Sequence, residues 1–314
     1  MRPDALFWIA SMTKPMTAAA VMMLVDEGKV ALDDPVEKYL PELKGLWVVA
    51  EQDGDRLVLK RPAKPVTIRR LLSHTSGMPF ASRLEQPTLD RFTLRDGVVS
   101  YAMTPLVYEP GSKYQYSNAG INTAGRIIEV VSRMPYEEFM HKRLFDPLGM
   151  KDTTFWPNEG QLARLAKAYR PGPPGKGLME TPIGQLRYPL TDRTRQPMPA
   201  GGLFSTADDV GRFCRMVLGN GTFEGKQLLT ARAVREMTSC QTADLPASYG
   251  LGWQTGRKAG ERFGHGGAYS TQMAVDPRTG LVLVLLVHHA GFAGKEGGKI
   301  HATFLQAATE RFGK

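Results

Sequence analysis

The C-terminal part of the chain has a strand-like residue pattern, whereas the middle has a helical one, and this contrast limits the fold more than any other feature. Two strand-like runs, residues 268–275 and 281–288, are joined by a short turn of sequence DPRTG. Residues 296–312 then predict a closing helix, while the middle of the chain predicts amphipathic helices at 121–133 and 206–219. The pattern therefore predicts an α+β protein whose sheet comes from the end of the chain and perhaps its beginning.

Three local signals refine this outline. Asp53-Gly54 lies between two apolar runs and predicts a β-hairpin. Thr206, together with Ser205, offers an N-cap for the helix at 206–219. Proline and glycine recur through residues 171–202, which predicts a long ordered loop of the kind that often lines a site.

The chain has 314 residues, enough for one large domain or two lobes. It is 42% hydrophobic and 23% charged, which is typical of a soluble globular protein. The longest apolar run, residues 281–287, has the length of a strand and is too short to span a membrane. No secretory signal is visible, so we expect a cytoplasmic protein as the chain stands, and a periplasmic or secreted one if its N-terminus is truncated.

The charge balance is basic, with 40 Lys+Arg against 31 Asp+Glu, a net charge of +9. The densest basic run, residues 60–64 followed by Arg69-Arg70, has no interleaved aromatic residues that could stack on bases. We therefore expect a solvated face and no nucleic-acid partner. Cys214 and Cys240 lie far apart and outside any C-x-x-C motif, which favours free thiols.

A serine and a lysine, Ser11 and Lys14, lie three residues apart where an apolar helix begins. Residues 15–28 predict that helix, which is rich in Ala, Met, Leu and Val and is closed by Gly28. Pro15 must lie in the first turn, so the helix begins near the serine. On a helix, residues i and i+3 share a face with Cβ atoms about 5–6 Å apart. The amine can therefore reach the hydroxyl.

A lysine amine is a useful base only if burial or a neighbouring cation lowers its pKa. The apolar residues 7–10 supply a setting for such burial. However, S-x-x-K alone is expected about once by chance in a chain of this length. A serine at the start of a helix is also a favoured N-cap. The pair by itself leaves both interpretations open.

Two further elements offer the remaining groups of a catalytic site. Tyr116 and Asn118, in YQYSNAG, precede an amphipathic helix. A tyrosine near a serine and a lysine can be pushed toward phenolate and share proton transfer, and a carboxamide can orient lysine and substrate. Residues 264–268 (GHGGA) begin a strand, where glycines let a substrate lie along the edge. A backbone N–H from this strand and that of Ser11 could form an oxyanion hole.

These three elements, in this order and at these separations, resemble the serine β-lactamase/penicillin-binding-protein superfamily. More narrowly, they are similar to the class C β-lactamase-related branch, which includes the family VIII carboxylesterases and the D-stereospecific aminopeptidases. Other segments resemble this family too and together span nearly the whole chain: LLSHTSGM (71–78), GSKYQYSNAG (111–120), LFDPLGM (144–150), GGLFSTADDVGRF (201–213) and SYGLGW (248–253).

The resemblance implies an α+β fold of the β-lactamase/transpeptidase type, in which an antiparallel sheet flanked by helices packs against a mostly helical lobe. We expect a single domain over residues 1–314. Its α/β lobe would comprise about 1–28 with 248–314, and its helical lobe about 29–247. Ser11 would then lie at the seam between the two lobes.

The resemblance also implies roles for individual residues. Ser11 resembles the acylated nucleophile and Lys14 its basic partner. Tyr116 resembles the tyrosine of the Y-x-N motif, which serves as general base, and Asn118 resembles the amide that holds the substrate.

The third motif departs from the family pattern. His265, Gly266 and Gly267 take the place of the Lys-Thr-Gly strand motif, where the resemblance implies substrate binding, and Ala268 would give the second oxyanion N–H beside that of Ser11. A lysine there faces the carboxylate of a β-lactam or a peptide C-terminus, whereas a histidine that is mostly neutral near pH 7 attracts that anion less. The departure favours neutral esters or amides.

The start of the chain is the second departure. Relatives have a helix and strands before the S-x-x-K helix, and this chain has only ten residues there. We therefore expect N-terminal strands to be missing from the sheet. An uncovered sheet edge invites association, so a homo-oligomer through that edge is one expectation.

We expect a cofactor-independent serine hydrolase that acts through an acyl-enzyme on Ser11, and most of all a carboxylesterase on short-chain esters. A β-lactamase, a D-amino-acid peptidase or a penicillin-binding protein would use the same site. A non-catalytic member that binds cell-wall peptide or a protein partner is the alternative from another class. His288-His289 has no carboxylate or cysteine at ligand spacing, so no metal is expected. His74 is expected to make a structural hydrogen bond.

Overall fold

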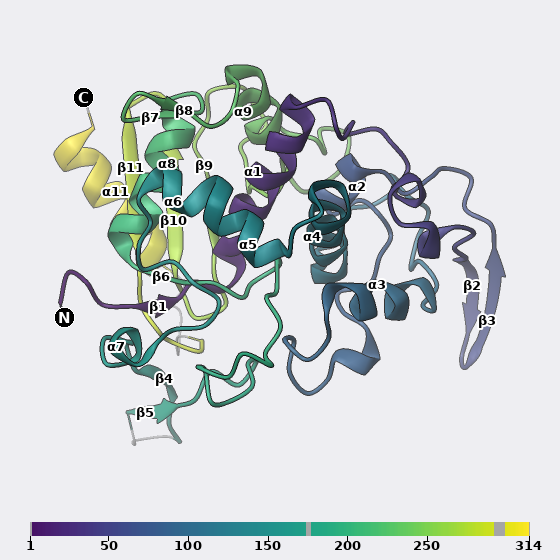
Figure 1. Cartoon of the computed structure of the whole chain (residues 1–314), viewed down its shortest axis with the longest axis horizontal. Coiled ribbons are helices and arrows are strands. Elements are labelled where there is room, and N and C mark those ends of the chain that lie inside the picture. Colours follow the sequence, from purple (N-terminus) through teal and green to yellow (C-terminus); the bar gives the residue numbers. More distant parts are fainter. Residues whose placement is uncertain (1, 174–176, 292–298, 314) are drawn as a thin grey trace.

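The computed structural model describes residues 2–173, 177–291 and 299–313 (Figure 1). Its helices are α1 (Thr13–Asp26), α2 (Ile68–Leu72), α3 (Leu94–Ala102), α4 (Asn118–Ser132), α5 (Tyr136–Met140), α6 (Asp146–Leu148), α7 (Glu159–Leu162), α8 (Ala207–Leu218), α9 (Ala231–Thr238) and α11 (Ile300–Phe312). Its strands are β1 (Phe7–Trp8), β2 (Val48–Asp53), β3 (Arg56–Lys60), β4 (Ala168–Pro171), β5 (Leu178–Thr181), β6 (Phe204–Ser205), β7 (Thr222–Phe223), β8 (Lys226–Gln227), β9 (Phe263–Gly266), β10 (Gln272–Asp276) and β11 (Leu281–Leu285). No helix within the described ranges is both long and apolar enough to cross a membrane.

The principal sheet is antiparallel, has the order β11–β10–β9 and comes from the end of the chain. Met273 of the central strand β10 pairs with Val284 of β11 and with His265 of β9. Helix α8 packs on β10 and β11, and helix α11 packs on β11. Arg262 ties α11 to the sheet, because its guanidinium contacts both Asp276 (2.9 Å) and Thr309 (3.0 Å). Helices α8 and α11 therefore support the sheet that contains β9.

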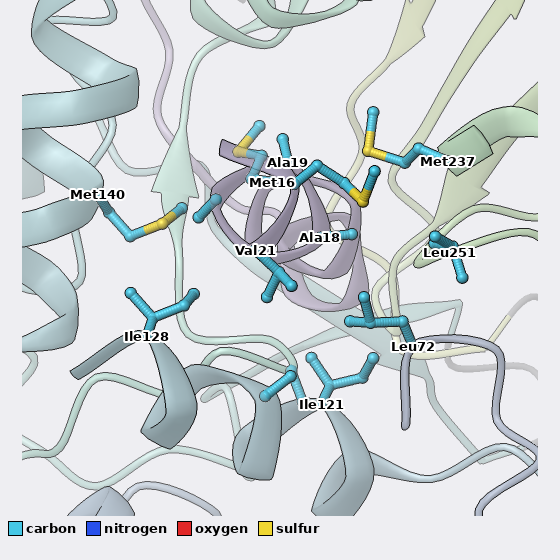
Figure 2. Packing of buried hydrophobic residues seen from close by; sticks show 14 of the residues in the cluster. Met16, Ala18, Ala19, Val21, Leu72, Ile121, Ile128, Met140, Met237 and Leu251 are labelled. Atoms are coloured by element: carbon cyan, nitrogen blue, oxygen red, sulfur yellow. The ribbon is translucent and has the colours of Figure 1, made fainter. Parts of the chain in front are cut away.

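Helix α1 lies at the centre of the molecule, between the sheet and helices α2, α3 and α4 (Figure 1). Every residue from Thr13 to Leu24 is buried, so most of the helix has no solvent-facing side. Small alanines let neighbouring elements approach closely, and unbranched methionines fill irregular gaps. Figure 2 shows Met16, Ala18, Ala19 and Val21 enclosed by side chains from other elements: Leu72, Ile121, Ile128, Met140, Met237 and Leu251. The start of α1 is thus held in place by its surroundings.

Helix α4 connects the helical part of the molecule to α1. It packs against α1, α2, α3 and α5. Its N-cap is Ser117, whose hydroxyl accepts a hydrogen bond from the Gly120 N–H at 3.0 Å. Such a cap satisfies a backbone donor that the helix itself cannot pair. The cap fixes the first residue of α4, Asn118.

A long segment between β5 and β6 crosses the molecule without regular structure and ends beside α1. A buried ion pair anchors it: the Nε of Arg195 lies 2.8 Å from the Asp90 carboxylate, and both side chains are at most 2% exposed. The same guanidinium donates to the carbonyl oxygens of Leu190 (2.8 Å) and Phe155 (3.1 Å). The segment then returns through β6, which pairs with β1 just before Ser11.

Most of the predicted elements are confirmed. The helices expected at 15–28, 121–133 and 206–219 are α1, α4 and α8, and the hairpin at Asp53-Gly54 is β2–β3. Thr206 caps α8 as expected. The fold is α+β with an antiparallel sheet and flanking helices. Both cysteines are free thiols.

Several boundaries were wrong. Residues 268–271 form a turn and not a strand, since the Gly267 N–H bonds to the Thr271 carbonyl oxygen, and β10 begins only at Gln272. Strand β11 ends at Leu285. The closing helix begins at Ile300, and residues 296–298 of its predicted range lie outside the described residues.

Within the residues that the structure describes, the start of the chain does not join the principal sheet, because β1 pairs with β6 instead. The division into two lobes, 1–28 with 248–314 and 29–247, stays a prediction. Helix α8 falls within 29–247 but packs on the sheet.

Candidate active site

Ser11 lies in a single 3-10 turn, Ala10–Met12, that leads directly into α1. Neither this turn nor α1 has a side-chain cap, so the serine hydroxyl is not used as a helix cap. The preceding residue, Ala10, has a φ of +46°, a left-handed conformation that is uncommon for alanine. Such backbone outliers cluster at functional sites. The Ser11 Oγ lies 3.1 Å from the Nζ of Lys14, as the i, i+3 spacing predicted.

Lys14 is completely buried, with 0% exposure. Its Nζ also donates to the Ala200 carbonyl oxygen at 2.6 Å and lies 4.6 Å from the centre of the Tyr116 ring. Burial lowers the pKa of Lys14 well below its usual value. None of the ion pairs within the described residues includes this lysine, so no carboxylate counteracts that effect. The direction of the pKa favours a neutral amine, which is the form that can accept a proton.

Tyr116 also reaches the serine, since its side chain hydrogen-bonds Ser11. Burial raises the pKa of Tyr116 well above its usual value, and the hydrogen bond to Ser11 opposes this only in part. The expectation that this tyrosine is pushed toward phenolate is therefore wrong for the resting site. Its hydroxyl keeps its proton, because the tyrosine lies in a poorly solvated place beside a neutral amine.

Asn118 opens helix α4 and is 5% exposed. Its backbone N–H donates to the Phe80 carbonyl oxygen at 2.9 Å, which fixes the residue. Its side-chain Oδ1 is buried and has no hydrogen-bond partner among the described residues. Buried polar groups are normally paired, so this unpaired amide oxygen is an exception within the described residues.

His265 lies on β9 with its ring buried. Its Nδ1 is 2.7 Å from the Gly266 carbonyl oxygen and its Nε2 is 2.8 Å from the Tyr249 hydroxyl. The carbonyl can only accept, so the ring proton is on Nδ1 and Tyr249 donates to Nε2. Burial and the nearby Lys14 lower the pKa of His265 to about 3. The histidine is therefore neutral at pH 7, as the sequence predicted.

The end of β9 lies directly against the segment that leads into Ser11. A Cβ placed on Gly267 would lie 2.5 Å from the Ile9 carbonyl oxygen, so only glycine fits there without a shift. In the described part of the chain, the N–H groups of Ser11 and Ala268 donate to no protein acceptor. Ala268 is also exposed. The two N–H groups expected for an oxyanion hole are thus unused.

The residues that hold the lysine were not predicted from the sequence. Ala200 accepts from Lys14 through its carbonyl, and its own N–H donates to the Asn122 Oδ1 at 3.0 Å. The Asn122 Nδ2 contacts the Tyr101 hydroxyl (3.2 Å), which donates to the buried Glu85 carboxylate (2.6 Å). Asn122 lies four residues after Asn118 on the same helix, and this i, i+4 spacing was the one available signal. A backbone carbonyl has no sequence signal of its own.

An aromatic residue at the mouth of the site was also missed. Phe80 accepts hydrogen bonds at its carbonyl oxygen from the N–H groups of Asn118 and Ala119, at 2.9 and 3.0 Å. Its ring is 49% exposed and stacks on the Tyr116 ring at 6.4 Å. An exposed phenylalanine held this firmly beside Tyr116 forms an apolar wall.

Comparison with known proteins supports the resemblance seen in the motifs. The family model described as Beta-lactamase matches residues 1–308. Protein Rv1367c of Mycobacterium tuberculosis is 34% identical over 92% of this chain and 79% of its own length. Esterase EstB of Burkholderia gladioli is 30% identical over 95% of this chain and 80% of its own. The solved structure of EstCE1, described as a hydrolase with promiscuous acyltransferase activity, superposes with a TM-score of 0.71 at 25% identity, covering 92% of this chain and 81% of that one. The chain belongs to the beta-lactamase family.

Proposed function

We propose that this chain is a serine hydrolase that forms an acyl-enzyme on Ser11. The observation that supports this best is the 3.1 Å contact between the Lys14 Nζ and the Ser11 Oγ, in which the lysine is fully buried. A buried amine without a carboxylate partner is a base, and a serine beside a base is a nucleophile. Among the relatives, EstB is named an esterase and EstCE1 a hydrolase, which agrees with this proposal.

In the first half-reaction, the neutral amine of Lys14 accepts the Ser11 hydroxyl proton while Oγ attacks the substrate carbonyl. The carbonyl oxygen becomes an oxyanion that the N–H groups of Ser11 and Ala268 stabilise. When the C–O bond to the leaving alcohol breaks, the alkoxide takes a proton from the Tyr116 hydroxyl. Lys14 returns its proton to Tyr116, because both side chains hydrogen-bond Ser11 in the resting site and so lie beside the same reacting group. The alcohol leaves and the ester with Ser11 remains.

In the second half-reaction, water replaces the alcohol. Lys14, now neutral again, draws a proton from the water through Tyr116, and the hydroxide formed attacks the acyl carbonyl. The second tetrahedral intermediate collapses, Ser11 Oγ recovers a proton from Lys14, and the acid leaves. The Ala200 carbonyl oxygen holds the lysine in place in both halves, 2.6 Å from Nζ.

Two features favour uncharged esters with short acyl chains as substrates. His265 is neutral and its ring is buried against Tyr249, so this position offers no cation to a substrate carboxylate. The half-exposed ring of Phe80 offers an apolar surface beside the site. An uncharged ester with a small apolar group satisfies both conditions.

β-Lactams and D-amino-acid peptides are the second candidate class. The buried and unpaired Asn118 Oδ1 favours them, because it can accept the N–H of an amide substrate. The missing cation at His265 opposes them, since these substrates contain a carboxylate. We therefore rank them below esters.

Parallel assays of ester and β-lactam hydrolysis test this ranking. We expect p-nitrophenyl butyrate to be hydrolysed with a kcat/KM more than about tenfold above that for nitrocefin. The Ser11→Ala variant should be inactive on both, whereas Ser112→Ala, at an exposed serine, should retain full activity. Rates on the two substrates within tenfold of each other would remove the preference for esters. An inactive protein that still bound peptidoglycan fragments would favour a non-catalytic binding role.

We also propose that the chain forms a homo-oligomer through an edge of the principal sheet. Within the described residues, strand β11 pairs with β10 on one side only. A strand with an open edge has unpaired backbone groups that a second copy can satisfy. Light scattering after size-exclusion chromatography at micromolar concentration should find more than one copy per particle, and a monomer would contradict this.

A further inference from the structure

His74 lies in the segment LLSHTSGM, just after helix α2, and its role is not accounted for by the reaction above. It is completely buried, with 0% exposure, and its backbone is left-handed, with a φ of +59°. This conformation is uncommon for residues other than glycine, although asparagine, aspartate and histidine adopt it more often than the rest. A buried residue keeps an unfavourable conformation only where its surroundings fix it. The contacts of His74 therefore show what the conformation achieves.

His74 accepts two hydrogen bonds from the residues on either side of Tyr116. The Gln115 N–H donates to the His74 carbonyl oxygen at 2.9 Å, and the Ser117 N–H donates to the His74 Nδ1 at 3.1 Å. The Tyr108 hydroxyl donates to the same carbonyl oxygen at 3.1 Å. One residue thus holds the backbone immediately before and immediately after the tyrosine.

The imidazole of His74 also contacts the tyrosine ring itself. The two ring centres are 4.4 Å apart, and the centre of the Tyr249 ring lies 4.7 Å from that of the imidazole. The Tyr116 side chain is therefore confined by the same residue that fixes its backbone. Packing of this density leaves little room for another rotamer.

The hydrogen bond at Nδ1 defines the state of the ring. Because Nδ1 accepts from a backbone N–H, the proton of the neutral imidazole is on Nε2. Burial, together with the nearby Lys14 and His265, lowers the pKa of His74 well below its usual value. The Nδ1 lone pair thus stays available to the Ser117 N–H throughout the neutral range.

We propose that His74 is a positioning residue: it holds the backbone on both sides of Tyr116 and so keeps the tyrosine hydroxyl at Ser11. The inference rests on the proposed function, in which Tyr116 passes a proton to the leaving alcohol and later passes one from water to Lys14. Among the described residues, the hydrogen bonds that His74 accepts come from Tyr108, Gln115 and Ser117, and none of its hydrogen bonds joins it to Ser11 or Lys14. Its effect is on the rate of the chemical step and not on substrate affinity.

The variants His74→Gly and His74→Asn separate this role from a general contribution to folding. Both remove the imidazole, and both tolerate a left-handed backbone. Asparagine Oδ1 and histidine Nδ1 are each one bond from Cγ, so asparagine can still accept from the Ser117 N–H, whereas glycine cannot. The two variants differ mainly in that acceptor. Tyr116→Phe serves as the reference for complete loss of the hydroxyl.

We expect His74→Gly to lower the kcat for p-nitrophenyl butyrate by about 10- to 100-fold, since misplacement near 1 Å has effects of this size. His74→Asn should recover kcat to within about threefold of the unmodified protein, and KM should change by less than about threefold in both. Active-site titration and the melting temperature provide the correction for any unfolded fraction.

Equal corrected kcat values for the two variants, or a change in KM in place of kcat, would overturn the proposal. If Tyr116→Phe is itself as active as the unmodified protein, the proposed function fails at Tyr116. If Tyr116→Phe is inactive and His74→Gly is fully active, only the positioning role fails.

Discussion

The substitution Gly267→Ala tests whether the end of β9 and the segment before Ser11 form one oxyanion hole. A Cβ at this position would lie 2.5 Å from the Ile9 carbonyl oxygen and 2.1 Å from the Thr271 Oγ1. Ordinary van der Waals contact begins near 3.4 Å. The threonine side chain can rotate, but the Ile9 carbonyl belongs to the backbone. The two segments must therefore move apart by about 0.9 Å to restore normal contact.

That displacement acts on the distance between the two N–H groups that hold the oxyanion. A misplacement of about 1 Å costs roughly 100-fold in rate, and loss of one oxyanion donor costs about 10²–10³ in kcat, or about 2.7–4 kcal/mol. We expect the kcat of Gly267→Ala for p-nitrophenyl butyrate to fall about 100-fold. KM should change less than about threefold, because the contact strengthens only in the transition state.

Gly266→Ala is the matched comparison, because it adds the same methyl group to the same strand. Its nearest neighbour would be the Thr271 carbonyl oxygen at 3.7 Å, which is ordinary contact. Any decrease in the kcat of Gly266→Ala measures crowding of the substrate alone, and we expect this decrease to stay below about tenfold. Steady-state kinetics, with circular dichroism as a check on folding, measure both variants. A folded Gly267→Ala protein with kcat within threefold of the unmodified protein would refute the shared oxyanion hole.

Three further outcomes follow from the structure. Lys14 must be neutral to accept a proton, and its pKa lies well below the usual 10.5. In a pH profile of ester hydrolysis, kcat/KM should therefore fall only as the pH drops through that lowered pKa. A profile that still rises near pH 10.5 would contradict this. Asp90→Ala leaves the Arg195 guanidinium buried without its carboxylate, which should lower the free energy of unfolding by about 3–5 kcal/mol. Urea denaturation measures this change. A decrease of less than about 1 kcal/mol would show that the ion pair does not anchor the segment between β5 and β6. Phe80→Ala removes the apolar wall, so the KM for p-nitrophenyl butyrate should rise about 2- to 12-fold, the equivalent of about 0.5–1.5 kcal/mol. The KM for p-nitrophenyl acetate should rise less. An equal rise for both esters would argue against contact between Phe80 and the acyl chain.

Local geometry explains which features of the site could be predicted. The i, i+3 spacing of Ser11 and Lys14 led to the observed contact, because a helix fixes the positions of residues that are close in sequence. The cap of α8 at Thr206 is local in the same way. The neutral state of His265 followed from the ordinary pKa of histidine, and burial against Tyr249 then lowers that pKa further.

Features that depend on distant contacts could not be predicted. The second acceptor of Lys14 is a backbone carbonyl at Ala200, far away in the chain, and any residue type could supply it. The protonation of Tyr116 was predicted in the wrong direction, because spacing identifies neighbours and does not measure desolvation. The strand expected to begin at 268 starts at Gln272, since a tight turn held by the Gly267 N–H precedes it.

Intact-mass spectrometry after reaction with a fluorophosphonate is the decisive test of whether Ser11 is an activated nucleophile. We expect one adduct per chain, located on Ser11 by peptide mapping and absent in Ser11→Ala. Lys14→Met should label far more slowly, because the base that activates the hydroxyl is gone. An adduct on another residue, or none on a folded protein that is also inert toward p-nitrophenyl butyrate, would contradict the account.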